Sequence, residues 1–189
     1  MILENEKIKQ ALEYIKEEDP ATTQDTLNMC QIPAPSYKEE KKAEYIRERF
    51  REIGLRDVRI DAVGNVLGIW PGTDEGPSVM LAAHTDTVFP EGTDLTIRKE
   101  GNRYYCPGIN DDTHAVAEMI AVAKAMIHAD LHTKGDLIFC ANVCEEGLGD
   151  LRGVKYLFGY DNKASEECPE VDAFVSIDNQ YTGGVIYTA

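Results

Sequence analysis

Short apolar runs alternate with helical segments along this chain, and this alternation restricts the possible folds more than any other feature. Residues 79–83 and 136–143 are strand-length and largely apolar, as is typical of strands buried on both faces. Between them, residues 114–129 carry a wide apolar face at helical spacing. Buried strands alternating with helices predict an α/β fold, a three-layer αβα sandwich with a central mixed sheet.

Spacing and turn residues predict the remaining elements. Ile8, Leu12 and Ile15 recur at helical spacing. Ser36 and Glu39 form a capping-box pattern for a helix that should end near Gly54. Further strands are expected at 57–61, 65–70, 94–98, 171–177 and 184–188, and a further helix at 151–160.

Charge and cysteine content limit the partners and the compartment. The 34 acidic and 19 basic residues give a formal net charge of −15, which argues against nucleic acid or an anionic membrane as partner and leaves metal cations open. The five cysteines are odd in number and lack CxxC spacing, so packing thiols are expected rather than disulfides or zinc ligands. Without a signal sequence or a membrane-length apolar run, a cytoplasmic protein is predicted.

Acidic residues and one histidine gather where strands end or where the long helix begins. They are His84 with Asp86, the pair Asp111-Asp112, the pair Glu145-Glu146, and Asp178. Sites in open α/β sheets form beyond the carboxyl ends of the strands, so these side chains are expected to converge. So many carboxylates need a cation to offset their repulsion, whereas each cluster taken alone would be read as a solvated turn.

The residue types favour a hydrolytic metal site. His84 and Asp86 lie on the same side of extended chain, so the imidazole could bind a metal while the carboxylate orients it. One histidine with carboxylates and no thiolate suits zinc, manganese or cobalt. One carboxylate can bridge two ions, and in Glu145-Glu146 one acid could bind metal while its neighbour moves a proton.

Four motifs occur in a characteristic order: HTDTVFP, PGINDDTHAVA, ANVCEEGLGDLRG and SID. Together they resemble the dinuclear-zinc peptidase and deacylase family that includes glutamate carboxypeptidase, peptidase T and acetylornithine deacetylase. The resemblance implies a zinc-dependent hydrolase of peptide or N-acyl amide bonds, acting on small peptides or N-acyl amino acids. The implied roles are first-metal ligands His84 and Asp178, bridging ligand Asp111, second-metal ligand Glu146, orienting residue Asp86 and general base Glu145.

The chain also departs from the family pattern. Thr113 and His114 stand where many relatives carry Lys and Gly, so His114 is either a residue at the rim of the site or an exposed residue at the helix start. Relatives continue through a lid or dimerisation domain to a late histidine that completes the second metal. His128 cannot replace it, since it would lie roughly 20 Å from Asp111 along the helix, and His132 lies farther still.

Residues 1–189 are therefore expected to form one incomplete catalytic domain, inactive or impaired as a fragment. A truncated, non-catalytic metal-binding or interaction protein is the alternative, and a two-zinc aminopeptidase with another chain order is a weaker one. Uncovered sheet edges make a homo-oligomer plausible.

Overall fold

The central sheet has five strands among the residues that the computed structural model describes, which are 2–159 and 165–178. The strands are β1 (Arg56–Ile60), β2 (Val66–Trp70), β3 (Val79–His84), β6 (Leu137–Asn142) and β7 (Ala173–Ser176). In the order β1-β2-β6-β3-β7, the first three pair antiparallel and the last three pair parallel. The predicted mixed sheet is confirmed.

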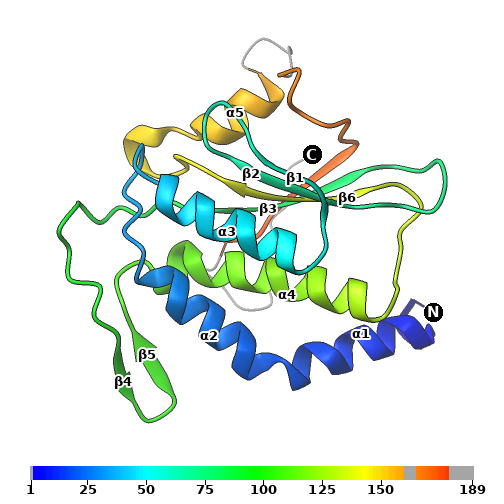
Figure 1. Ribbon diagram of the computed structural model, residues 1–189, viewed down its shortest axis with the longest axis horizontal. Helices are drawn as coiled ribbons and strands as arrows, with labels where there is room; N and C mark the ends of the chain where they lie inside the picture. The colour runs from blue at the N-terminus through cyan, green and yellow to red at the C-terminus, as the bar shows by residue number, and fades with distance from the viewer. Residues whose placement is uncertain (1, 160–164, 179–189) are drawn as a thin grey trace.

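Helices cover both faces of this sheet (Figure 1). They are α1 (Glu6–Glu17), α2 (Asp19–Cys30), α3 (Glu40–Glu52), α4 (His114–His128) and α5 (Arg152–Phe158). Helices α3 and α4 lie on one face and α5 on the other, while α1 and α2 pack against the outer side of α4. This arrangement confirms the α/β fold and its three layers. No helix of the described ranges is long and apolar enough to cross a membrane.

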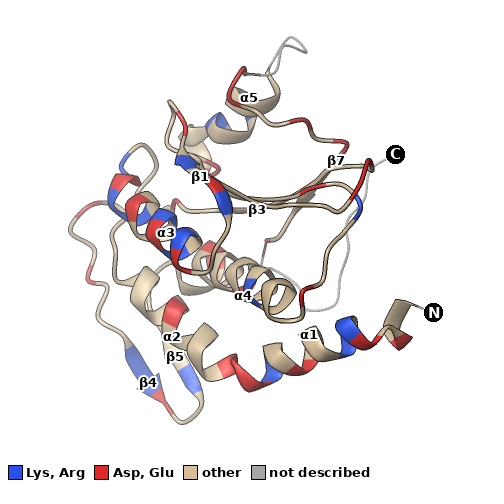
Figure 2. Cartoon of the chain, turned by 45° about the vertical axis from the view of Figure 1, so that its right-hand side comes forward, with Lys and Arg blue, Asp and Glu red and all other residues tan. Residues whose placement is uncertain are grey.

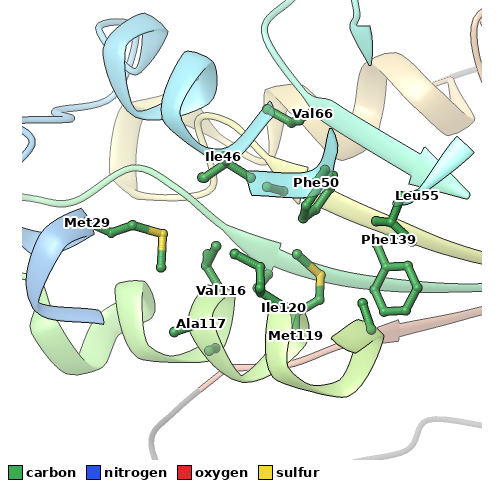
Figure 3. Packing of buried hydrophobic residues seen from close by; sticks show 14 of the residues in the cluster. Met29, Ile46, Phe50, Leu55, Val66, Val116, Ala117, Met119, Ile120 and Phe139 are labelled. Atoms are coloured by element: carbon green, nitrogen blue, oxygen red, sulfur yellow. The ribbon is translucent and has the colours of Figure 1, made fainter. Parts of the chain in front are cut away.

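The continuous apolar run of β6 is explained by burial on both sides. Successive side chains of a strand point to opposite faces. Leu137, Phe139 and Ala141 accordingly join the core under α3 and α4, whereas Ile138 and Cys140 pack with Leu157 of α5 on the other face. Figure 3 shows the first of these two cores, in which Phe139 of the sheet lies among side chains of α3 and α4.

Two elements differ from the sequence-based expectation. Helix α2 was not predicted, because its buried residues are mainly polar or small and form no apolar stripe. The strand expected at 94–98 is wrong. The Asp94 side chain accepts hydrogen bonds from the Thr96 amide and hydroxyl and closes a turn there. A separate hairpin of β4 (Arg98–Glu100) and β5 (Arg103–Tyr105) follows.

The predicted capping box is also wrong, although the helix it announced exists. Helix α3 begins at Glu40, and its N-cap Glu39 makes no side-chain capping bond. The Glu39 carboxylate instead accepts the backbone N–H of Cys144, which follows β6. The predicted stop is confirmed, since Gly54 follows the helix with a φ of 91°. The strand expected at 184–188 lies outside the described residues.

Candidate metal centre

The candidate centre lies at the carboxyl edge of the parallel strands. Strands β3 and β6 pair in register, with His84 opposite Asn142 at their ends. The residues that follow them therefore start from neighbouring points. Asp111 lies in the segment Ile109–Thr113, directly before α4, and the bond between Asp111 and Asp112 is a cis peptide. Topology alone thus brings together residues far apart in the sequence.

The predicted residues converge around the His84 imidazole. Its Nε2 lies 3.0 Å from Asp111 Oδ1 and 3.9 Å from Glu145 Oε2. Potential ligand atoms of His84, Glu145 and Glu146 all lie within 4.8 Å of one another, and those of His84, Asp111 and Asp178 do likewise. His84 is only 3% exposed, whereas Asp111 and Asp178 are accessible to solvent. The histidine of the centre is therefore buried, and the centre is open to solvent on the side of Asp111 and Asp178.

Asp86 is fully buried and contacts both His84 and the Glu145-Glu146 pair. Its Oδ1 accepts the Glu145 backbone N–H at 2.8 Å, and its Oδ2 accepts the Glu146 N–H at 3.1 Å and the Ser36 hydroxyl at 2.6 Å. His84 Nδ1 lies 3.1 Å from the Asp86 backbone oxygen and 3.4 Å from Oδ1. Burial alone would raise the pKa of Asp86, but these contacts hold it below its usual value.

Asp112 faces away from the open side. Its Oδ2 accepts the His84 backbone N–H at 3.0 Å, while its buried Oδ1 has no hydrogen-bond partner among the described residues. Burial raises the pKa of Asp112 to about 8, despite the nearby His84. The same neighbours act on His84: burial lowers its pKa, but Asp86, Asp112 and Glu145 outweigh that effect and raise it to about 9. The carboxylates around the His84 imidazole therefore favour its protonated form when no metal is bound.

The donor set fits divalent cations. Burial raises the pKa values of Glu145 and Glu146, and the negative charges of Asp111 and Asp86 raise them further. Such crowding of carboxylates disfavours their ionised forms unless a cation is bound. One imidazole with four carboxylates is a ligand set suited to zinc, manganese or cobalt rather than to a structural thiolate site.

The other histidines make contacts elsewhere. His114 lies 3.3 Å from the Thr26 hydroxyl through Nδ1 and 3.2 Å from Glu118 through Nε2. The ring of His128 stacks on Tyr14, and the ring of His132 stacks on Trp70. His84 is thus the histidine that the fold brings to the acidic residues.

Sequence reasoning missed two residues next to the centre, Ser36 and Lys42. Lys42 is 2% exposed, and its Nζ lies 3.3 Å from the hydroxyl of Thr113, which is also buried. The outer face of α3 carries the acidic and basic residues seen in Figure 2, several of them in ion pairs. One signal in the sequence could have found Lys42. It lies four residues before Ile46 and eight before Phe50, a spacing that places it on the apolar, buried face of the helix.

The buried Lys42 charge reduces stability at neutral pH. Burial lowers its pKa from 10.5 to about 8, although nearby Cys30, Asp86, Cys106 and Asp112 act in the opposite direction. Below pH 8 the Lys42 amine is protonated in both the folded and the unfolded state, so the full free-energy cost of burying its charge is present. That cost is relieved as the pH rises toward 10.5.

Lys42→Met should therefore be more stable than the parent at pH 7, by at most about 3 kcal/mol. Methionine keeps the packing volume without the desolvated charge. The advantage should shrink between pH 8 and 10.5, in the window set by the two pKa values, as measured by urea unfolding. Lys41→Met, at the exposed neighbouring position, is the control and should show a pH-independent difference. An advantage of Lys42→Met that stays constant with pH would contradict this account.

The sequence is similar to known hydrolases. Residues 80–185 match the family described as "Peptidase family M20/M25/M40". A LysW-lysine/LysW-ornithine hydrolase of Pyrococcus abyssi is 36% identical over 120 residues, which are 64% of this chain and 32% of that protein. A succinyl-diaminopimelate desuccinylase of Corynebacterium glutamicum is 29% identical over 185 residues, which are 96% of this chain and 46% of that protein. The chain spans less than half the length of these relatives.

Solved structures are similar in fold. The di-peptidase Dug1p of Saccharomyces cerevisiae gives a TM-score of 0.68 at 19% identity, over 90% of this chain and 41% of that one. The YxeP protein of Bacillus subtilis, described as a dinuclear metal-binding peptidase, gives a TM-score of 0.59 at 16% identity, over 87% of this chain and 44% of that one. The likeness extends over most of the described residues.

Proposed function

Because the chain belongs to peptidase family M20/M25/M40, we propose that it forms the metal-binding part of a zinc-dependent hydrolase of peptide or N-acyl amide bonds. The observation that carries this proposal is the convergence of His84 with the carboxylates of Asp111, Glu145, Glu146 and Asp178 at one sheet edge. The chain matches less than half of its relatives' length, so the activity of the whole protein belongs to the proposal.

The proposed ligands divide between two ions. His84 and Asp178 would hold the first ion, Glu146 the second, and Asp111 would be shared by both. The short contact between His84 Nε2 and Asp111 Oδ1, 3.0 Å in length, supports their common role. When bound, the ions would polarise the substrate carbonyl and lower the pKa of a water molecule. Manganese or cobalt could substitute for zinc in this ligand set.

Glu145 is the proposed general base. Its carboxylate lies 3.9 Å from His84 Nε2 and is partly exposed, with a pKa raised by burial and then by surrounding acids. A raised pKa suits a group that accepts the proton of the attacking water and returns it to the leaving nitrogen. Asp86 fixes the backbone of both Glu145 and Glu146, which keeps the base aligned with the ligand beside it.

The proposed substrates are small peptides or N-acyl amino acids. The names of the relatives support this class, since one is a desuccinylase and another a di-peptidase. A cytoplasmic location, and a homo-oligomer without nucleic-acid or membrane partners, stay predictions from the sequence.

A non-catalytic metal-binding protein is the second candidate. It is favoured by one observation: of the four histidines in the sequence, His84 alone contributes to the described centre.

Zinc analysis and an amide-hydrolysis assay separate the two candidates. The full-length protein is expected to contain zinc and to hydrolyse at least one member of a panel of dipeptides, N-succinyl and N-acetyl amino acids. Hydrolysis should stop with a chelator and return when zinc is added. Bound zinc without hydrolysis of any member would favour the non-catalytic candidate, and absence of both would contradict the metal centre.

A further inference from the structure

We propose that Lys42 is a positioning residue of the metal centre, holding Thr113, and through it the Asp111-Asp112 segment, in the arrangement that binds metal. The inference rests on the proposed metal centre and adds to it a residue outside the ligand set. Lys42 belongs to α3, whereas Thr113 directly follows the Asp pair and precedes α4. The contact between them therefore links α3 to the segment that carries the Asp111-Asp112 pair.

The contact is inside the protein. Lys42 and Thr113 are each 2% exposed, and the distance from Nζ to the hydroxyl oxygen is 3.3 Å. The Thr113 side chain makes no capping bond to α4, so its hydroxyl is not needed to start the helix. A buried hydroxyl facing a buried ammonium fixes the rotamer of the threonine, and with it the backbone that leads back to Asp111.

The charge of Lys42 distinguishes this role from simple packing. Asp86 and Asp112, both fully buried, are close enough to Lys42 to act on it electrostatically. A buried ammonium that is hydrogen-bonded to a neutral hydroxyl costs free energy, and in some proteins such groups are retained because they fix a particular arrangement. Lys42 also lies behind the centre, so by charge alone it would repel a bound cation.

These two effects predict opposite results for Lys42→Met. If Lys42 acted by charge alone, removing it would tighten zinc binding. If it positions the Asp pair, removing it should weaken zinc binding by about 10-fold, as is usual for residues that orient metal ligands. Thr113→Val, which removes the hydroxyl, should weaken zinc binding equally, and Thr113→Ser should bind like the parent. The double variant should bind zinc no more weakly than either single variant, because both substitutions remove the same contact.

Zinc affinity is measured on the purified chain by competition with a chromophoric chelator, with urea unfolding of each variant in parallel. Lys41→Met, which alters the exposed lysine next in sequence, is the matched control. Unchanged or tighter zinc binding by Lys42→Met, additive losses in the double variant, or a Thr113→Ser variant as weak as Thr113→Val would overturn the inference alone. Failure of the parent chain to bind zinc would instead contradict the metal centre and this inference with it.

Discussion

Glu145→Gln is expected to lower kcat by between about 100-fold and 10,000-fold while the protein keeps its zinc. Glutamine preserves the size of the side chain but cannot accept the proton of the attacking water. The proposed ligands His84, Asp111, Glu146 and Asp178 are untouched, and the backbone N–H of residue 145 still bonds Asp86. Steady-state hydrolysis of an N-acyl amino acid or dipeptide, with zinc measured on the same sample, checks both parts.

Glu146→Gln serves as the comparison next in sequence. As a proposed ligand, Glu146 should reduce zinc content when replaced, so the two adjacent glutamates should separate activity from metal binding. Glu52→Gln, on the exposed end of α3, should leave both unchanged. Full activity in Glu145→Gln would rule out Glu145 as the base, and loss of zinc there would assign it to the ligands instead.

The convergence of the acidic residues was predictable because it follows from strand order. Parallel strands end at one edge of a sheet. His84 ends one strand with a recognisable apolar run, and Glu145 follows shortly after another. The Asp111 pair was placed by the onset of an equally clear helical pattern. Periodicity and the position of polar residues were therefore sufficient to predict that these side chains converge, whereas their roles at a metal stay predictions.

The supports of the centre could not be predicted, because they join segments with no local relationship. Ser36 reaches Asp86 across 50 residues, and Lys42 reaches Thr113 across 71. Ser36 was instead assigned to a local cap, which would satisfy the same hydroxyl and looks identical in sequence. Helix α2 was missed for a related reason: its packing against α4 stabilises a segment whose own pattern is weak.

Asp86→Asn should weaken zinc binding by about 10-fold to 100-fold and lower the free energy of unfolding by about 1–3 kcal/mol. The Asp86 carboxylate accepts N–H bonds from Glu145 and Glu146 and the hydroxyl of Ser36. An asparagine has one acceptor oxygen, and its amide nitrogen would face donors in a site without solvent. The loss should therefore affect the ligand, the base and the fold together.

The control for Asp86→Asn is Asp94→Asn, because Asp94 also accepts bonds from a backbone N–H and a hydroxyl but does so at the surface. Water can satisfy the new amide there, so zinc affinity should not change and stability should change little. Zinc titration and urea unfolding of both variants give the comparison. Parent-like zinc affinity in Asp86→Asn would mean that the Asp86 backbone oxygen, 3.1 Å from His84 Nδ1, orients the histidine without the carboxylate.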